Sequence, residues 1–217
     1  MTETDTPAAS EEPVAHPLAR HLAESLATEH RPTRILLLGI GSGRNVPVLL
    51  GAGADVEVIE EHRQRAQAMR AHFGAQTRLR ISDGAYAGPF PIAGSFDGAL
   101  STHALLHGTP AGVASAVASV RERLFSGAHF FTTLGSKSDH RFGAGTRVAA
   151  DAFAPSDGAE AGVAHAYFDE AGVRALFAGF SIATIEEHDA SQSAGRWAHD
   201  ADDAAGTIHW FVRATRS

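Results

Sequence analysis

The 217-residue sequence contains no cysteine. This absence excludes disulfides, thiolate metal sites, cysteine-ligated iron–sulfur clusters and a cysteine nucleophile. Positive charge is also scarce, because 18 lysines and arginines stand against 25 acidic residues and the formal net charge is -7 at pH 7 with histidine neutral. Such a chain repels a phosphate backbone on average, so nucleic acid is not an expected partner.

Long apolar runs are absent as well. No window approaches the length that crosses a bilayer, so no membrane is expected as a partner. Residues 1–13 carry four acidic side chains and no basic one, the opposite of a secretory signal, and they predict a disordered acidic tail on a cytoplasmic protein. The chain is 44% hydrophobic, which is enough for one domain over residues 14–217 and short for two.

Three glycines at alternate positions, Gly39, Gly41 and Gly43, end an apolar run that begins at Arg34. The pattern predicts a buried strand, a tight turn and then a helix. Glycine is needed where the backbone takes a positive φ or where a ligand approaches the main chain closely. A nucleotide-like cofactor is therefore the first hypothesis. The alternative is a plain strand-to-helix turn in a glycine-rich protein.

The spacing of this turn argues against two common nucleotide-binding loops. A dinucleotide fingerprint needs a third glycine where Arg44 stands. The phosphate loop of NTPases ends in glycine, lysine and then serine or threonine, and Ser42 to Arg44 does not match this ending. A second predicted strand, residues 55–60, ends in Glu60. A carboxylate there can accept both ribose hydroxyls in charge-assisted hydrogen bonds. An adenosine that carries no pyrophosphate fits this pattern best.

Residues 35–45 resemble the first motif of the class I S-adenosylmethionine (SAM)-dependent methyltransferases, and Glu60 falls at the position of that family's ribose-binding acid. Residues 79–85 resemble the third-strand motif, whose acid contacts the adenine amino group, and residues 89–107 resemble the fourth-strand segment. A looser similarity to the small-molecule methyltransferases of the tellurite-resistance type extends from residue 165 to residue 214. The resemblance implies SAM as methyl donor and S-adenosylhomocysteine as product. It assigns to the cofactor the residues Gly39, Gly41, Ser42, Gly43, Asn45, Glu60, Asp83, Gly84, Thr102 and His103.

One position departs from the family pattern. The family usually has an acid two residues before the first glycine, where this chain has Leu37. An acid there normally helps to orient the loop or the methionyl end of the cofactor. Ser42 and Asn45 are the candidates to compensate for its absence.

Predicted strands alternate with predicted helices through the first two thirds of the chain. One helix has Pro17 in its first turn, and another begins at Thr109 and Pro110 and stops at Gly127. Residues 181–187 and 207–214 predict a closing antiparallel hairpin joined by an acidic loop. Strands that alternate with helices predict an α/β fold wound on both faces. The resemblance implies a mainly parallel, seven-stranded, Rossmann-like sheet, with ligands at the carboxyl ends of the strands.

Residues 135–164 interrupt this alternation, because they are rich in glycine and show no clear period. A loop of this length in a compact domain is usually functional or disordered, so the segment predicts a substrate lid. Arg141 is a candidate anchor for an anionic acceptor, with a solvated loop arginine as the alternative. His165 and Tyr167 alternate on an extended segment and could both face the site. Alternatively, Tyr167 packs against the lid.

His103 and His107 follow the predicted fourth strand at the mouth of the expected cleft. If helical they share one face and could form a pair of metal ligands, but no third ligand is recognisable nearby and no metal is predicted. His103 is therefore assigned to the cofactor side and His107 to the acceptor side.

The sequence thus predicts SAM-dependent methyl transfer to a small-molecule acceptor by in-line displacement. The sulfonium is intrinsically reactive, so the protein mainly aligns the reactants and excludes water, and a base is needed only for a protonated nucleophile. Two alternatives are a SAM-binding protein without transferase activity, which Leu37 favours, and an NAD-dependent oxidoreductase, which Arg44 disfavours. The acceptor, the attacked atom and the oligomeric state are left open.

Overall fold

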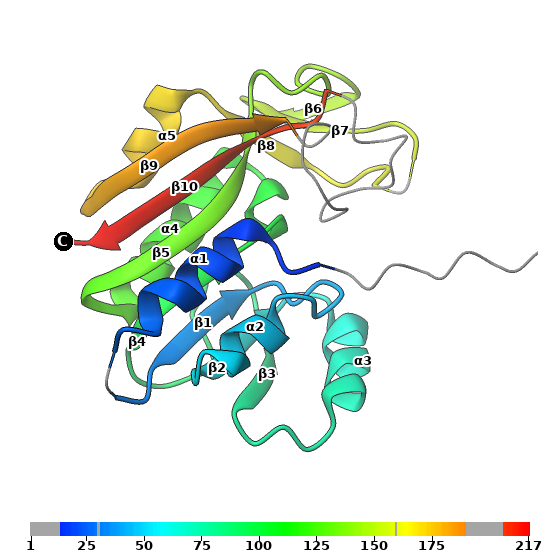
Figure 1. Cartoon of the computed structure of the whole chain (residues 1–217). Helices are drawn as coiled ribbons and strands as arrows, with labels where there is room; N and C mark the ends of the chain where they lie inside the picture. Colours follow the sequence, from blue (N-terminus) through cyan, green and yellow to red (C-terminus); the bar gives the residue numbers. More distant parts are fainter. Residues whose placement is uncertain (1–13, 30, 159, 190–205) are drawn as a thin grey trace, which may run out of the picture.

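The computed structural model describes residues 14–29, 31–158, 160–189 and 206–217 (Figure 1). The predicted acidic tail, residues 1–13, and the acidic loop of the closing hairpin lie outside the described residues. Among the helices of the described part, none is long and apolar enough to cross a membrane.

Seven strands form the main sheet in the order β3-β2-β1-β4-β5-β10-β9. Neighbours from β3 to β5 run parallel, and β10 is antiparallel to both β5 and β9 (Figure 1). The strands are β1 (Arg34–Leu38), β2 (Asp55–Glu60), β3 (Leu79–Asp83), β4 (Phe96–Ser101), β5 (Leu124–Ser136), β9 (Phe180–Asp189) and β10 (Ile208–Arg216). The predicted mainly parallel, seven-stranded sheet with a closing antiparallel hairpin is confirmed.

The central strand β1 shows how both faces of the sheet are covered. Leu36 and Leu38 join a core on one face, whereas Ile35 and Leu37 join a second core on the other. Successive side chains of a strand point to opposite faces, so a run of apolar residues fills both cores. The first core includes residues of α4 (Pro110–Arg123) and α5 (Glu170–Leu176), and the second is built with α1 (Pro17–Leu26), α2 (Val46–Gly51) and α3 (Arg63–Phe73).

Helix starts follow the local sequence closely. Pro17 lies in the first turn of α1, with His16 as the N-cap. The Thr109 side chain accepts a hydrogen bond from the backbone N–H of Gly112 at the start of α4, and Asp169 does the same for Gly172 in α5. These caps satisfy backbone donors that a helix leaves unpaired in its first turn.

The predicted end of α4 is wrong. The helix ends at Arg123 rather than at Gly127, because β5 begins immediately at Leu124. The ladder between β4 and β5 skips residues 125–128, and Gly127 takes a φ of 82° within this irregularity. Gly127 therefore serves a bulge in a strand, where sequence alone indicated a helix terminus.

Residues 135–164 are more regular than predicted. β5 continues to Ser136, and the segment contains a short antiparallel pair, β6 (Thr146–Ala149) and β7 (Ala152–Ala154). β7 pairs with β8 (His165–Phe168), which runs parallel to the end of β5. The prediction of an irregular loop is wrong because strands of three or four residues are too short to show a period of two.

Candidate functional site

The glycine turn after β1 has the predicted backbone, since φ is 76° at Gly39, 55° at Gly41 and 82° at Gly43. The three positions differ in their surroundings. A Cβ on Gly39 would lie 2.6 Å from the Cβ of Ala104, and one on Gly43 would lie 2.8 Å from the ring of Phe73. A Cβ on Gly41 would meet no atom within 4 Å. Gly39 and Gly43 thus allow close packing, whereas Gly41 presents the main chain to open space.

Glu60 lies at the end of β2, directly beside this turn, and is fully buried. Its Oε2 accepts a hydrogen bond from the Ile40 N–H at 3.0 Å, and its Oε1 accepts one from the His62 N–H at 2.9 Å. The Tyr86 hydroxyl lies 3.4 Å from Oε1. Glu60 therefore holds the glycine turn in place. Because each carboxylate oxygen has two lone pairs, a further donor can still be accepted.

Asp83 ends β3 and Gly84 follows it, next to Glu60. Asp83 is the register partner of Glu60 across the two parallel strands, and the Gly84 N–H donates to the Glu60 carbonyl at 3.1 Å. The Asp83 carboxylate forms ion pairs with Arg70 and, at 3.6 Å, with Arg63. The sequence-predicted cofactor acids therefore end neighbouring strands at one edge of the sheet.

Asn45 connects three elements on the other side of the turn. Its Oδ1 accepts a hydrogen bond from the His16 N–H at 2.9 Å, and its Nδ2 donates to the Thr102 Oγ1 at 2.8 Å. Thr102 follows β4 directly and His16 caps α1, so Asn45 fastens α1 and α2 to the end of β4. Ser42 lies exposed in the turn between β1 and α2.

His103 adopts a left-handed conformation with φ of 64°. Its N–H donates to the Thr133 Oγ1 at 2.8 Å, and Arg44 Nη2 lies 3.2 Å from its Nδ1. Burial lowers the pKa of Arg44 to about 10, so the guanidinium stays charged at neutral pH. In the sequence, Arg44 was notable only because it stands where a dinucleotide fingerprint has its third glycine. The structure shows that it also places a partly buried positive charge at the glycine turn.

His16 was not among the predicted site residues. Its Nδ1 accepts a hydrogen bond from the Leu18 N–H at 3.1 Å, and its ring packs edge-on against His103. Burial, reinforced by the charge of Arg44, lowers the pKa of His16 to about 2. The neutral ring can accept the capping hydrogen bond. The sequence signal was a polar residue directly before Pro17 at a helix start.

The interpretation of His103 and His107 as residues on one helical face is wrong. They flank the short 3-10 helix η1 (Ala104–Leu106) and have different partners. His103 contacts Arg44, whereas the Nε2 of His107 lies 3.3 Å from Glu160 Oε1. Glu160 belongs to the segment before β8, and no pattern in the sequence singled it out.

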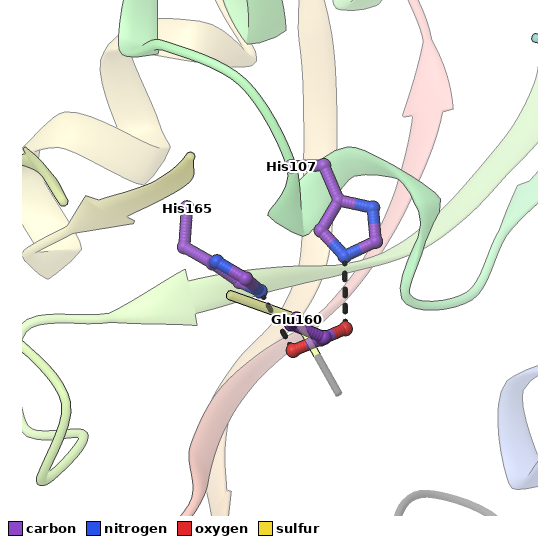
Figure 2. Close-up of side chains that lie close together, drawn as sticks. All are labelled: His107, Glu160 and His165. Carbon is purple, nitrogen blue, oxygen red and sulfur yellow. Dashed lines mark hydrogen bonds and ion pairs between the residues drawn. The ribbon is translucent and has the colours of Figure 1, made fainter. Parts of the chain in front are cut away.

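The four predicted acceptor-side residues, His107, Arg141, His165 and Tyr167, surround one region. His165 Nε2 lies 3.0 Å from Glu160 Oε2, and Arg141 Nη1 lies 3.6 Å from the same oxygen (Figure 2 shows the two histidines and Glu160). Arg141, His165 and Tyr167 all line a narrow cavity at the end of β5. The structure therefore places these four side chains in one region, and their assignment to the acceptor side stays a prediction.

Two of these side chains have clear structural partners as well. Arg141 donates two hydrogen bonds to the buried carboxylate of Asp139, from Nε at 3.1 Å and from Nη2 at 3.2 Å. It is therefore not a solvated loop arginine. The Tyr167 ring packs against Phe142 and Phe153 of the predicted lid. Burial raises the pKa of the Tyr167 hydroxyl to about 12, so it stays protonated at neutral pH.

No protein-family model and no curated protein matches the sequence. Solved structures do share its fold. The 1,6-didemethyltoxoflavin N1-methyltransferase from Burkholderia thailandensis, with bound 1,6-didemethyltoxoflavin and S-adenosylhomocysteine, has a TM-score of 0.65 at 20% identity over 93% of this chain and 77% of its own. A SAM-dependent methyltransferase from Methanosarcina mazei has a TM-score of 0.68 at 15% identity over 94% of this chain and 98% of its own.

TehB from Haemophilus influenzae, of the tellurite-resistance type, has a TM-score of 0.59 at 16% identity over 90% of this chain and 61% of its own. At these identities the likeness shows the fold. The chain has the class I methyltransferase fold, as the resemblance implied.

Proposed function

We propose that the protein is a SAM-dependent methyltransferase that acts on a small-molecule acceptor. The observation that carries this proposal is the turn around Gly41, where main chain with a positive φ faces open space beside the buried carboxylate of Glu60. In α/β sheets of this kind, ligands bind beyond the carboxyl ends of the strands. The shared fold of methyltransferases solved with S-adenosylhomocysteine or sinefungin supports the choice of ligand.

The residues at this edge fit the parts of the cofactor. Glu60 and Asp83 supply carboxylates for the ribose hydroxyls and the adenine amino group, and the Gly41 main chain allows close approach. The methionyl end carries a carboxylate, for which the charged, partly buried Arg44 is a suitable partner. Leu37 replaces the acid that usually helps to orient the methionyl end, and Arg44 is the charged residue that this chain offers for that purpose. Ser42, Gly84, Thr102 and His103 complete the proposed cofactor site.

The acceptor side is proposed to be the region around His107, Arg141, His165 and Tyr167. When bound, SAM supplies a methyl group on a positively charged sulfur. The protein then has to align the acceptor with that methyl carbon and exclude water, which can contribute about 7 to 11 kcal/mol in favourable cases. Residues 135–164 are proposed to act as the lid. The hairpin of β6 and β7 pairs with β8, which carries His165 and Tyr167, so movement of the lid is connected to the acceptor side.

Ligand-induced thermal stabilisation tests the cofactor. S-adenosylhomocysteine should stabilise the folded chain by about 2.7 kcal/mol at a hundredfold excess over its dissociation constant, because it binds only the folded state. The melting temperature is measured with and without ligand, and NADH serves as the control. A shift with NADH and none with S-adenosylhomocysteine would favour an oxidoreductase over a methyltransferase.

A SAM-binding protein without transferase activity is the second candidate, because Leu37 lies fully buried where an acid is usual. Thermal stabilisation does not separate it from an enzyme. Formation of S-adenosylhomocysteine from SAM, measured across a panel of oxygen, nitrogen and sulfur nucleophiles, does. Methyl transfer to any member of the panel identifies an enzyme and its acceptor class together.

A further inference from the structure

One potential metal ligand that follows η1 meets two from the segment that leads into β8 (Figure 2). His107 follows η1, Glu160 lies in the turn before β8, and His165 is the first residue of β8. One ligand atom from each lies within 4.8 Å of the others. The backbone fixes this meeting, because His107 and His165 form an antiparallel bridge and the Gly108 N–H donates to the Ala164 carbonyl at 2.7 Å.

The hydrogen bonds of His165 restrict where its protons can be. Its Nδ1 lies 2.9 Å from the Val163 carbonyl, which can only accept, so Nδ1 carries a hydrogen. In a neutral ring, Nε2 then presents a lone pair to Glu160 Oε2 at 3.0 Å. An ionised carboxylate has no hydrogen to donate. A positive charge, either a second proton or a metal ion, is therefore required between these two atoms.

On the other side of the carboxylate, His107 Nε2 lies 3.3 Å from Oε1, where it can donate a hydrogen as the neutral Nε2–H tautomer or offer its lone pair to a shared ion. An ordinary glutamate is ionised at neutral pH, so Glu160 presents a negatively charged carboxylate to both rings. A bound zinc ion with bonds of about 2.0 to 2.1 Å in tetrahedral geometry separates neighbouring ligand atoms by about 3.3 Å. The two nitrogen–oxygen distances, 3.0 and 3.3 Å, are similar to this value, but each is to a different oxygen of Glu160, so one ion between the rings would contact both carboxylate oxygens.

Arg141 does not remove the need for a cation. Its Nη1 lies 3.6 Å from Glu160 Oε2, but its other guanidinium nitrogens bind the buried carboxylate of Asp139 at 3.1 and 3.2 Å. One positive charge thus faces two carboxylates. The cluster also has an accessible side, because 36% of the His107 side chain is exposed whereas only 4% of the His165 side chain is.

We propose that His107, Glu160 and His165 bind a divalent transition-metal ion, with zinc as the best chemical match. Two imidazoles and one carboxylate form a ligand set that is typical of sites with an open coordination position. The Val163 carbonyl completes the arrangement, because a metal-bound histidine usually donates its second N–H to such a group. The ion joins the segment before β8 to the end of η1, and so holds part of the lid against the site.

The proposal replaces the expectation that the protein binds no metal. That expectation was based on the pair of His103 and His107 alone. Metal binding does not depend on the methyltransferase proposal. A role of the open position in binding the acceptor does rest on it, because that position would then face the proposed acceptor side.

Cobalt(II) is the probe for the experiment, since its visible absorption reports ligand number and geometry. The full-length protein, freed of metal with a chelator, is titrated with cobalt and then with zinc. One equivalent of cobalt should bind with an absorption typical of low coordination number, and zinc should displace it. The variants Glu160→Gln and His107→Gln should each weaken cobalt binding at least tenfold.

The matched control is His21→Gln. His21 pairs with Glu24 at 3.4 Å on the exposed surface of α1, so it tests whether an ordinary histidine–carboxylate pair binds the probe. This variant should bind cobalt as the unchanged protein does. Circular dichroism and S-adenosylhomocysteine binding are measured on every variant, so that loss of the fold is separated from loss of the ligand.

Absence of cobalt binding by the unchanged protein, or equal affinity in Glu160→Gln and His107→Gln, would overturn the proposal and leave a protonated histidine paired with Glu160. If the protein binds S-adenosylhomocysteine but does not bind cobalt, only the metal site is ruled out. Binding of cobalt without S-adenosylhomocysteine supports the metal site and defeats the proposed function.

Discussion

At the scale of single residues, the glycine turn shows that one sequence pattern serves two physical purposes. Gly39 and Gly43 are required by neighbouring side chains, since any Cβ there would overlap Ala104 or Phe73. Gly41 has no such neighbour. All three have a positive φ, so backbone conformation alone does not separate their roles. The roles differ in the space around the position that a Cβ would occupy.

Gly41→Ala is expected to weaken S-adenosylhomocysteine binding at least tenfold, about 1.4 kcal/mol, because the new methyl group occupies the space proposed for the cofactor. Gly74→Ala is the matched control. Gly74 also has a φ of 55° with no atom near its Cβ position, and it lies after α3 rather than in the turn. Isothermal titration measures both affinities. Equal weakening in the two variants would mean that backbone strain alone explains the loss.

Glu160 illustrates a residue that sequence could not identify. It stands in a segment without periodicity, three residues from Val163 and five from His165. Its importance comes from the fold of the turn, which brings its carboxylate between two imidazoles. His107 and His165 were both predicted for the acceptor side, whereas nothing in the sequence indicated that they would contact the same carboxylate.

At the scale of elements, local signals fixed the starts of helices better than their ends. Thr109 and Asp169 each cap a helix through a side-chain oxygen that accepts a hydrogen bond from the N–H three residues later. The end of α4 depends instead on β5, because pairing with β4 extends the strand back to Leu124. An end that depends on a distant strand cannot be read from the helix sequence.

The proposed lid offers a test at this scale. Arg147 lies exposed in β6, so trypsin should cut after it in the free protein. S-adenosylhomocysteine should slow this cut severalfold if the lid closes over the cofactor site, because cleavage follows the population of the open state. Mass spectrometry identifies the site, and Arg147→Gln, which removes it, is the control. A rate that is the same with saturating ligand would show that the hairpin is not a lid.

At the scale of the whole molecule, the sheet order determines which residues form the site. The adjacency of β1, β2 and β3 brings the glycine turn, Glu60 and Asp83 to one edge. Pairing of β8 with the end of β5 brings His165 and Tyr167 to the other side. Glu60 is 21 residues from Gly39 and 23 from Asp83, and Tyr167 is 32 from its strand partner Gly135, so their proximity is a property of the fold.

Stability of the whole chain should depend on the protonation of His16. Its pKa is about 2 in the folded protein against an ordinary value of 6.5, so below pH 6.5 only the unfolded chain takes up this proton. Stability is therefore lost as pH falls, by about 1.4 kcal/mol per pH unit from this one group. Asparagine at this position keeps a side-chain acceptor for the start of α1.

The free energy of unfolding, measured by denaturant titration at pH 7.5 and pH 5.5, should therefore fall more in the unchanged protein than in His16→Asn, by about 1.4 kcal/mol. His21→Asn is the control, because it makes the same replacement at an exposed histidine of α1. Parallel losses in the unchanged protein and His16→Asn would show that His16 takes up its proton in the folded state.

The sequence by itself determined the order of strands and helices, the glycine turn and the acids that end β2 and β3, because these depend on short-range periodicity, backbone conformation and local capping. The tertiary structure decided the partners: Arg44 with His103, Asn45 with Thr102, and Glu160 with two histidines. It also decided the short strands β6 to β8, which are stabilised by pairing with one another and with β5. Most of these contacts join residues far apart in the chain, and their geometry exists only once the sheet has formed.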